Sequence, residues 1–160
     1  MSQNTLRTHS LQISIRLPLS GSHEPLLDPA QTAWSQLGDF DQWIKWIPGV
    51  DKVVRLNQGE TGRGSRVRLQ SGTLHEDWTI AYWEPWRHIA FIIHDAGSRV
   101  TYDCYIDAAE DNSQLNLTLE LEFAFSGYRR LLSPLLIWMQ KRKAVRWLES
   151  FKIHIQLLVN

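Results

Sequence analysis

Apolar and polar residues alternate with a period of two over most of this chain, which is typical of strands with one buried face. The first run holds Leu11, Ile13, Ile15 and Leu17 between polar neighbours. The same period returns after residue 50, and the short connections carry Gly, Asn or Asp, as antiparallel hairpins require. The sequence predicts an antiparallel sheet of about seven strands with one dry and one wet face, over the ranges 11–17, 50–56, 65–69, 78–82, 89–93, 100–106 and 115–123.

Two short helices are predicted between the first two strands. Asp28 followed by Pro29 is an N-cap with proline at the first helical position, and Gly38 ends that segment. Asp39 then caps a second short helix through Trp43.

The last segment is predicted to be one long helix. Ser133 suits the cap, Pro134 fits the first turn, and apolar residues recur at helical spacing as far as Leu158. A sheet with one apolar face needs a cover, and this helix is the only large candidate. The expected fold class is α+β, with the sheet wrapped around the C-terminal helix. One helix cannot fill a wide curved sheet, so a cavity between them is expected.

Three short motifs add a family resemblance. The chain reads Trp43-x-x-Trp46-x-Pro48-Gly49-Val50, then Gly62-x-Gly64-Ser65, then Glu84-Pro85-x-Arg87. In this order and spacing they resemble the polyketide cyclase/dehydrase-like family of the START/Bet v 1 (SRPBCC) superfamily, over almost the whole chain. The resemblance implies a helix-grip fold with a hydrophobic cavity, and it does not name the ligand. We expect a single START-like domain over 10–160, after a disordered tail over 1–9.

Length and composition indicate the number of domains and the cellular compartment. A length of 160 residues suits one domain, and eight tryptophans indicate a large core, an apolar pocket or a sticky surface. Cys104 is the only cysteine, so an internal disulfide is impossible and a reducing compartment is expected. Residues 1–10 lack the apolar core of a signal peptide, and no segment approaches a membrane span of roughly 20 apolar residues. We therefore expect a cytoplasmic protein.

The alternation also selects candidate site residues. Tyr82, Tyr102 and Glu76 fall on the apolar face, where a hydroxyl or a desolvated carboxylate can orient a carbonyl or move a proton. The competing interpretation is that the hydroxyls satisfy backbone groups at the cavity rim and that Glu76 lies in water. Trp43, Trp46, Trp138 and Trp147 either line the pocket or pack as core. The expected ligand-binding residues are Trp78, Ile80, Tyr82, Phe91, Ile93, Tyr102, Leu119, Leu121, Met139 and Trp147.

Neither a metal nor a cofactor is expected. His75, Asp77 and His94 share a sheet face, but it is the wet face opposite Trp78, where such clusters arise readily. Gly62 and Gly64 lie between two strands, whereas a phosphate-binding glycine loop lies between a strand and a helix. A hairpin turn is therefore predicted there.

Charge is unevenly distributed although the net charge is zero. Residues 126–160 carry seven basic residues against one acidic residue, a net +6, so the rest of the chain carries −6. An apolar run over 131–139 lies between basic clusters, which suits peripheral contact with an anionic membrane. The alternative is a solvated helix face with its leucines buried against the sheet. Nucleic acid is not expected as a partner, and the oligomeric state stays open. The residues that would meet the membrane are Arg129, Arg130, Lys141, Arg142 and Lys143.

Three functions follow from these observations. The first is a protein that binds a hydrophobic small molecule, which is polyketide-, lipid- or isoprenoid-like, in an internal cavity. The second is a polyketide cyclase or dehydratase with a cavity Tyr or Glu as acid/base. The third is a lipid or quinone carrier that docks on membranes by its basic C-terminal helix. No residue in the sequence fixes the ligand.

Overall fold

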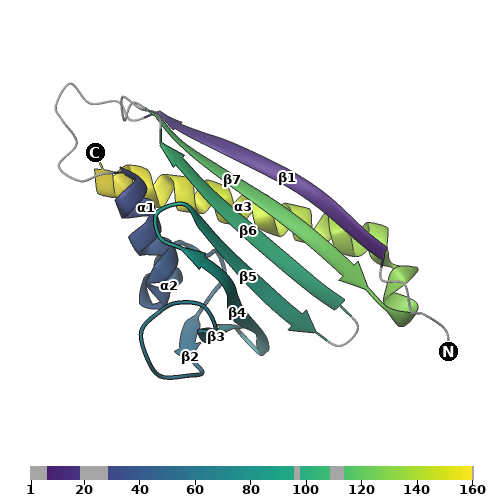
Figure 1. The fold of residues 1–160 in the computed structure, drawn as a ribbon. Helices are drawn as coiled ribbons and strands as arrows, with labels where there is room; N and C mark the ends of the chain where they lie inside the picture. The colour runs from purple at the N-terminus through teal and green to yellow at the C-terminus, as the bar shows by residue number, and fades with distance from the viewer. Residues whose placement is uncertain (1–6, 19–28, 96–97, 109–113, 160) are drawn as a thin grey trace.

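A computed structural model describes residues 7–18, 29–95, 98–108 and 114–159 (Figure 1). The elements follow the predicted order, with helical segments between the first two strands and a long helix at the end. Their bounds are β1 Arg7–Pro18, α1 Pro29–Gly38, the 3-10 segment η1 Phe40–Gln42, α2 Trp43–Trp46, β2 Lys52–Arg55, β3 Arg66–Ser71, β4 Leu74–Glu84, β5 His88–Asp95, β6 Ser98–Ala108, β7 Gln114–Phe125, the 3-10 segment η2 Gly127–Arg130, and α3 Ser133–Val159.

The strands form one seven-stranded antiparallel sheet, as predicted, in the order β1-β7-β6-β5-β4-β3-β2. Figure 1 shows β1 alongside β7 at one edge, while β2 to β7 follow one another as a meander. The register sets apolar residues opposite apolar residues, as in the pairs Trp78↔Ile93 and Tyr102↔Leu121. All four side chains are buried, which confirms the dry face.

Helix α3 covers that dry face. It runs across the sheet and contacts β1, β7, α1 and α2 (Figure 1). Its buried residues recur every three or four positions, so one stripe of an amphipathic helix faces the core. The helix-grip fold is therefore confirmed. Within the described residues, no helix has the length and apolarity needed to cross a membrane. The stripe contains Ala144, Trp147, Leu148, Phe151 and Ile155.

The first strand begins earlier than predicted. Residues 7–9, expected in a disordered tail, pair with β7, as in Arg7↔Phe125 and His9↔Phe123. The backbone ladder of an edge strand needs no apolar side chains, so its polar start gave no signal in the sequence. Residues 1–6 of the expected tail lie outside the described residues.

The helical segment after α1 also differs from the prediction. Asp39 is the predicted cap, and its side chain accepts a 3.1 Å hydrogen bond from the backbone N–H of Asp41. It caps the 3-10 turn η1, and α2 then continues to Trp46 instead of ending at Trp43. The extension matters because it brings Trp46 into the core. The predicted cap of α1, Asp28, lies outside the described residues.

A β-bulge in β4 overturns one face assignment. Ile80 pairs with Phe91 but Tyr82 pairs with Ala90, so Ala81 is an extra residue on β4. Because the bulge shifts the alternation by one residue, Tyr82 lies on the outer face and is 45% exposed. The prediction that Tyr82 lies on the apolar face is therefore wrong.

The bulge turns Trp83 inward in place of Tyr82. Trp83 pairs with the buried Ile89, and its ring meets the edge of Trp34 from α1 at a centroid distance of 4.7 Å. The ring also lies against Gly38, where an added Cβ would sit 2.8 Å from Trp83 Cη2. The end of α1 therefore packs closely on β4, and a side chain at residue 38 would collide with that contact.

Candidate ligand-binding site

Most of the expected ligand-binding residues form a packed core between the sheet and the helices. The ring of Trp43 lies at its centre and makes edge contacts with Phe40, Trp46, Trp78 and Phe91, at centroid distances of 5.0–5.9 Å. Such edge-to-face arrangements are the favoured geometry of aromatic pairs. Trp43 and Trp46 therefore belong to the core. The expected ligand-binding residues that are at most 7% exposed are Trp78, Ile80, Phe91, Ile93, Tyr102, Leu119, Leu121 and Trp147.

A hollow opens beside this core, between α3 and the chain that follows α2. Its volume is about 270 Å³, and we call it the α3 groove. Two of the expected ligand-binding residues, Met139 and Trp147, line it, and so does Trp138. The α3 groove is lined by Ile47, Pro48, Trp138, Met139, Arg142, Lys143, Arg146 and Trp147.

Helical spacing and one turn build these walls. Residues 138–139, 142–143 and 146–147 repeat every four positions, so they project from the same side of α3. The facing wall is Ile47 and Pro48, at the C-terminal end of α2. The chain reverses there because Gly49 adopts a φ of +78°, a conformation that side chains with a Cβ rarely adopt.

A polar cluster lies at Lys143, where the α3 groove meets the sheet. The Nζ atom of Lys143 lies 2.7 and 2.5 Å from the two carboxylate oxygens of Glu76. Trp78 donates a 3.2 Å hydrogen bond from Nε1 to the same carboxylate. The hydroxyl of Tyr102 donates a 2.8 Å hydrogen bond to Oε1 of Gln140 on α3. Glu76 and Tyr102 therefore lie on the apolar face, as predicted, and each has a partner on α3.

Burial decides what the groups of this face can do chemically. Desolvation, followed by the negative charge of Glu76, raises the pKa of the Tyr102 hydroxyl, so it stays protonated and acts as a hydrogen-bond donor. Its ring stacks on Trp78 at a centroid distance of 5.0 Å. Burial also raises the pKa of the Cys104 thiol, which removes the thiolate that a nucleophile needs.

The α3 groove is apolar along its walls and cationic at its rim. The Arg142 guanidinium lies over the ring of Trp138 at 4.6 Å from its centroid, a cation–π contact. Neither Arg142 nor Arg146 forms an ion pair with a carboxylate among the described residues. The indole N–H of Trp147 is buried and has no hydrogen-bond acceptor among the described residues. A buried donor without an acceptor lowers the stability of the fold by about 1–3 kcal/mol.

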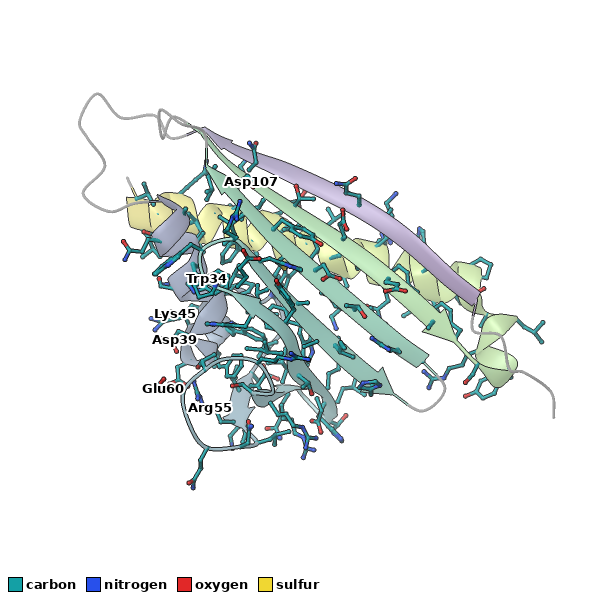
Figure 2. All side chains as sticks on the ribbon, viewed as in Figure 1. Trp34, Asp39, Lys45, Arg55, Glu60 and Asp107 are labelled. Carbon is teal, nitrogen blue, oxygen red and sulfur yellow. The ribbon has the colours of Figure 1, made fainter. Side chains whose placement is uncertain are left out.

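A second hollow of about 360 Å³ lies on the side of α1 and η1, and it is more open to solvent than the α3 groove. Figure 2 labels three of its residues, Trp34, Asp39 and Arg55. Its polar groups already have local partners. Arg55 donates to the backbone oxygen of Gly59 and to the Thr61 hydroxyl, and Asp39 caps η1. The α3 groove is the better candidate because its two arginines carry charge that no carboxylate of the described residues balances.

The outer face of the sheet carries ion pairs of its own. Arg68 holds Asp77 through two hydrogen bonds of 2.6 and 2.8 Å, and the guanidinium lowers the pKa of that carboxyl. Within the described residues, no three His, Cys, Asp or Glu side chains are placed to hold a metal ion, so His75, Asp77 and His94 form no such site.

The glycine segment joins β2 to β3 with Gly64 at φ +87°, which confirms the predicted hairpin.

Sequence reasoning did not identify five of the eight residues that line the α3 groove. In the sequence, Ile47 and Pro48 indicate the end of a helix and a turn. No local pattern indicates that they line a groove. The sequence predicts a membrane contact or a solvated face for Arg142 and Lys143, and it marks Arg146 only as part of the positive charge of this segment. The available signal was their helical register with Met139 and Trp147, two residues already expected to bind the ligand.

Comparisons with known proteins agree with this architecture. Zhui aromatase/cyclase from a Streptomyces species has a TM-score of 0.72 at 17% identity, covering 96% of this chain and 97% of that one. Norcoclaurine synthase from Thalictrum flavum has a TM-score of 0.70 at 8% identity, with coverages of 95% and 96%. A START superfamily protein from Mycobacterium smegmatis has a TM-score of 0.65 at 14% identity, with coverages of 94% and 98%. At these identities the likeness shows the fold alone.

The sequence itself supplies the family. No curated protein matches it significantly. A family model described as "Polyketide cyclase / dehydrase and lipid transport" matches residues 29–156, which is most of the chain. This protein therefore belongs to the polyketide cyclase/dehydrase and lipid transport family, within the helix-grip superfamily that the sequence motifs resemble.

Proposed function

We propose that this protein binds a hydrophobic small molecule in the α3 groove, against Trp138, Met139 and Trp147. The observation that carries the proposal is the groove itself. It is a hollow of about 270 Å³ with apolar walls, just below the roughly 300–1,000 Å³ of typical ligand pockets. Family membership supports the same function, because its description names lipid transport. We propose the cytoplasm as the compartment, supported by the single buried thiol of Cys104.

Affinity should come from apolar burial. Each CH₂ that leaves water contributes about 0.8 kcal/mol, which is about fourfold in Kd. A series of straight-chain alcohols should therefore bind about fourfold more tightly for each added CH₂ until the groove is full. Titration calorimetry measures this slope directly. Alcohols that bind without any dependence on chain length would contradict the proposal.

A groove-filling variant locates the site. Met139→Trp enlarges a side chain that lines the groove, so it should weaken decanol binding. Leu135→Trp is the matched control, because Leu135 lies one turn earlier on α3, is 54% exposed compared with 53% for Met139, and does not line the groove. Decanol binding that is equal in the two variants would place the ligand elsewhere.

A second candidate function is docking on an anionic membrane. One observation favours it: large apolar side chains are exposed from η2, through the link to α3, into the first turns of α3, with Leu131 of the link exposed by 86%. Basic residues of the same segment, such as Lys141 and Arg142, would complement anionic lipid headgroups. We call the exposed apolar side chains of this segment the apolar shoulder. They are Tyr128, Leu131, Leu132, Leu135, Trp138 and Met139.

The apolar shoulder can be tested separately from the groove. Leu131→Ser together with Leu135→Ser removes two exposed leucines that do not line the groove. The double variant should lose binding to vesicles of phosphatidylcholine and phosphatidylglycerol while it keeps decanol binding. Binding to these vesicles that is unchanged in the variant would rule out the apolar shoulder as the docking surface.

The enzymatic alternative is a cyclase or dehydratase in which Glu76 or Tyr102 moves a proton. Glu76 contacts Lys143, which lines the groove, so a carboxylate and an ammonium group stand at one end of the ligand site. A poly-β-ketone substrate mimic should then lose water in the presence of the protein, and Glu76→Gln should stop that loss. Mass spectrometry follows the reaction, and the same rate with and without the wild-type protein would exclude this activity.

A further inference from the structure

The charges around the α3 groove do not balance. Three cationic side chains line it, Arg142, Lys143 and Arg146, whereas among the described residues the one carboxylate paired with them is Glu76. Glu76 is engaged by Lys143 and by the indole N–H of Trp78. The described residues therefore leave two guanidinium groups without an anionic partner beside an apolar hollow.

The two arginines are placed to act together. They are four positions apart on α3, so they project from the same side of the helix, one turn apart. The guanidinium of Arg142 lies over the ring of Trp138, and this contact leaves its N–H donors available to a ligand. A guanidinium binds carboxylate or phosphate oxygens through paired hydrogen bonds, which gives geometry as well as charge.

Apolar groups continue directly from these cations. Trp138, Met139 and Trp147 line the same groove, and Ile47 and Pro48 face them. A ligand with an oxygen-bearing head would bring acceptors to the guanidinium groups of Arg142 and Arg146, which line the same groove.

We propose that the ligand of the α3 groove is an amphipathic anion. Its carboxylate or phosphate head binds Arg142 and Arg146, and its apolar chain or ring system lies against Trp138, Met139 and Trp147. This inference rests on the proposed function and narrows it, because a neutral hydrophobic molecule would leave both guanidinium groups without an anionic partner among the described residues. The head belongs either to a free amphiphile or to an anionic lipid in a bilayer, and both present the same chemistry.

The test compares decanoate with decanol, which have the same chain and differ in the charge of the head. By titration calorimetry at low salt, decanoate should bind about tenfold more tightly or better, as expected for hydrogen bonds to charged groups. Added salt should weaken decanoate binding and leave decanol unchanged. Equal affinities would overturn the anion proposal and leave the proposed function standing. If neither ligand binds and anionic vesicles do not bind either, both fail.

Variants locate the head. Arg142→Gln with Arg146→Gln should remove the preference for decanoate, so that the variant binds decanoate and decanol with equal affinity. Lys141 lies on the same helix but does not line the groove, so Lys141→Gln should leave the affinities for decanoate and decanol unchanged. Circular dichroism and thermal melting check the fold, and Arg146→Gln alone replaces the double variant if that one unfolds. Decanoate binding that survives loss of both guanidinium groups would overturn the proposal.

Vesicles distinguish the two sources of the anion. If one molecule of decanoate binds per protein in solution, the anionic head belongs to a free amphiphile. Binding confined to vesicles that contain phosphatidylglycerol, and lost in the Arg142→Gln, Arg146→Gln variant, assigns it to a bilayer lipid. Equal binding of wild-type protein and this variant to those vesicles, without any decanoate binding, would refute a role for the two arginines.

Discussion

Gly38→Ala should destabilise the protein, although alanine favours helices more than glycine does. The added Cβ would sit 2.8 Å from Cη2 of Trp83, whereas carbon atoms in contact prefer about 3.5–4.0 Å. The rigid ring of Trp83 cannot withdraw freely, because it packs against the edge of Trp34. Overpacking costs about 1–3 kcal/mol and the gain in helix propensity returns up to about 1 kcal/mol. We expect a net loss of about 1–2 kcal/mol, or a Tm lower by about 2–8 °C.

Urea unfolding followed by circular dichroism measures this change. Gly62→Ala is the control, because an added Cβ there meets nothing within 4 Å and its φ is not positive. That variant should stay within about 0.5 kcal/mol of wild type or gain slightly. In a double-mutant cycle, Trp83→Leu should remove most of the cost of Gly38→Ala. If Gly38→Ala were as stable as wild type, Trp83 would not lie inward and the β4 bulge would be refuted.

Three further outcomes test the buried groups and the outer face. Tyr102→Phe removes the hydrogen bond to Gln140 and should cost about 1 kcal/mol in urea unfolding, and a cost near zero would contradict that contact. Cys104 is buried with a raised thiol pKa, so it should resist a thiol reagent at pH 8 until denaturant is added, and fast labelling of folded protein would contradict its burial. The lowered pKa of Asp77 means that its pairing with Arg68 stabilises the fold above about pH 4 and is lost as pH falls through the lower folded pKa. Asp77→Asn should therefore flatten the stability profile in that acid range, and an unchanged profile would contradict the pairing.

The strands could be predicted from the sequence because burying one face of a sheet imposes a period of two. The pair Trp78↔Ile93 and the buried Leu119 and Leu121 follow directly from that alternation. The bulge could not be predicted in the same way. Ala81 carries no glycine or proline signal, and an extra residue changes the face of every residue after it. Tyr82 and Trp83 exchanged faces for that reason.

The site was predictable only in part, because a cavity depends on how side chains fill space. Helical spacing identified Met139 and Trp147, but it could not show that the rings of Trp43 and Trp46 would fill the interior. The contact of Lys143 with Glu76 joins residues 67 positions apart, and no local pattern in the sequence signals such a pairing. The groove lies at the edge of the core because the central tryptophans occupy the middle.

The position of a bound ligand tests the central claim most directly. Crystals grown with a terminally brominated decanol allow the bromine atom to be located by anomalous scattering. The account predicts a single strong peak in the α3 groove, in contact with Trp138, Met139 or Trp147, and its loss in the Met139→Trp variant. A peak elsewhere on the molecule, or one that persists in the same place in Met139→Trp, would contradict the claim that this groove is the ligand site.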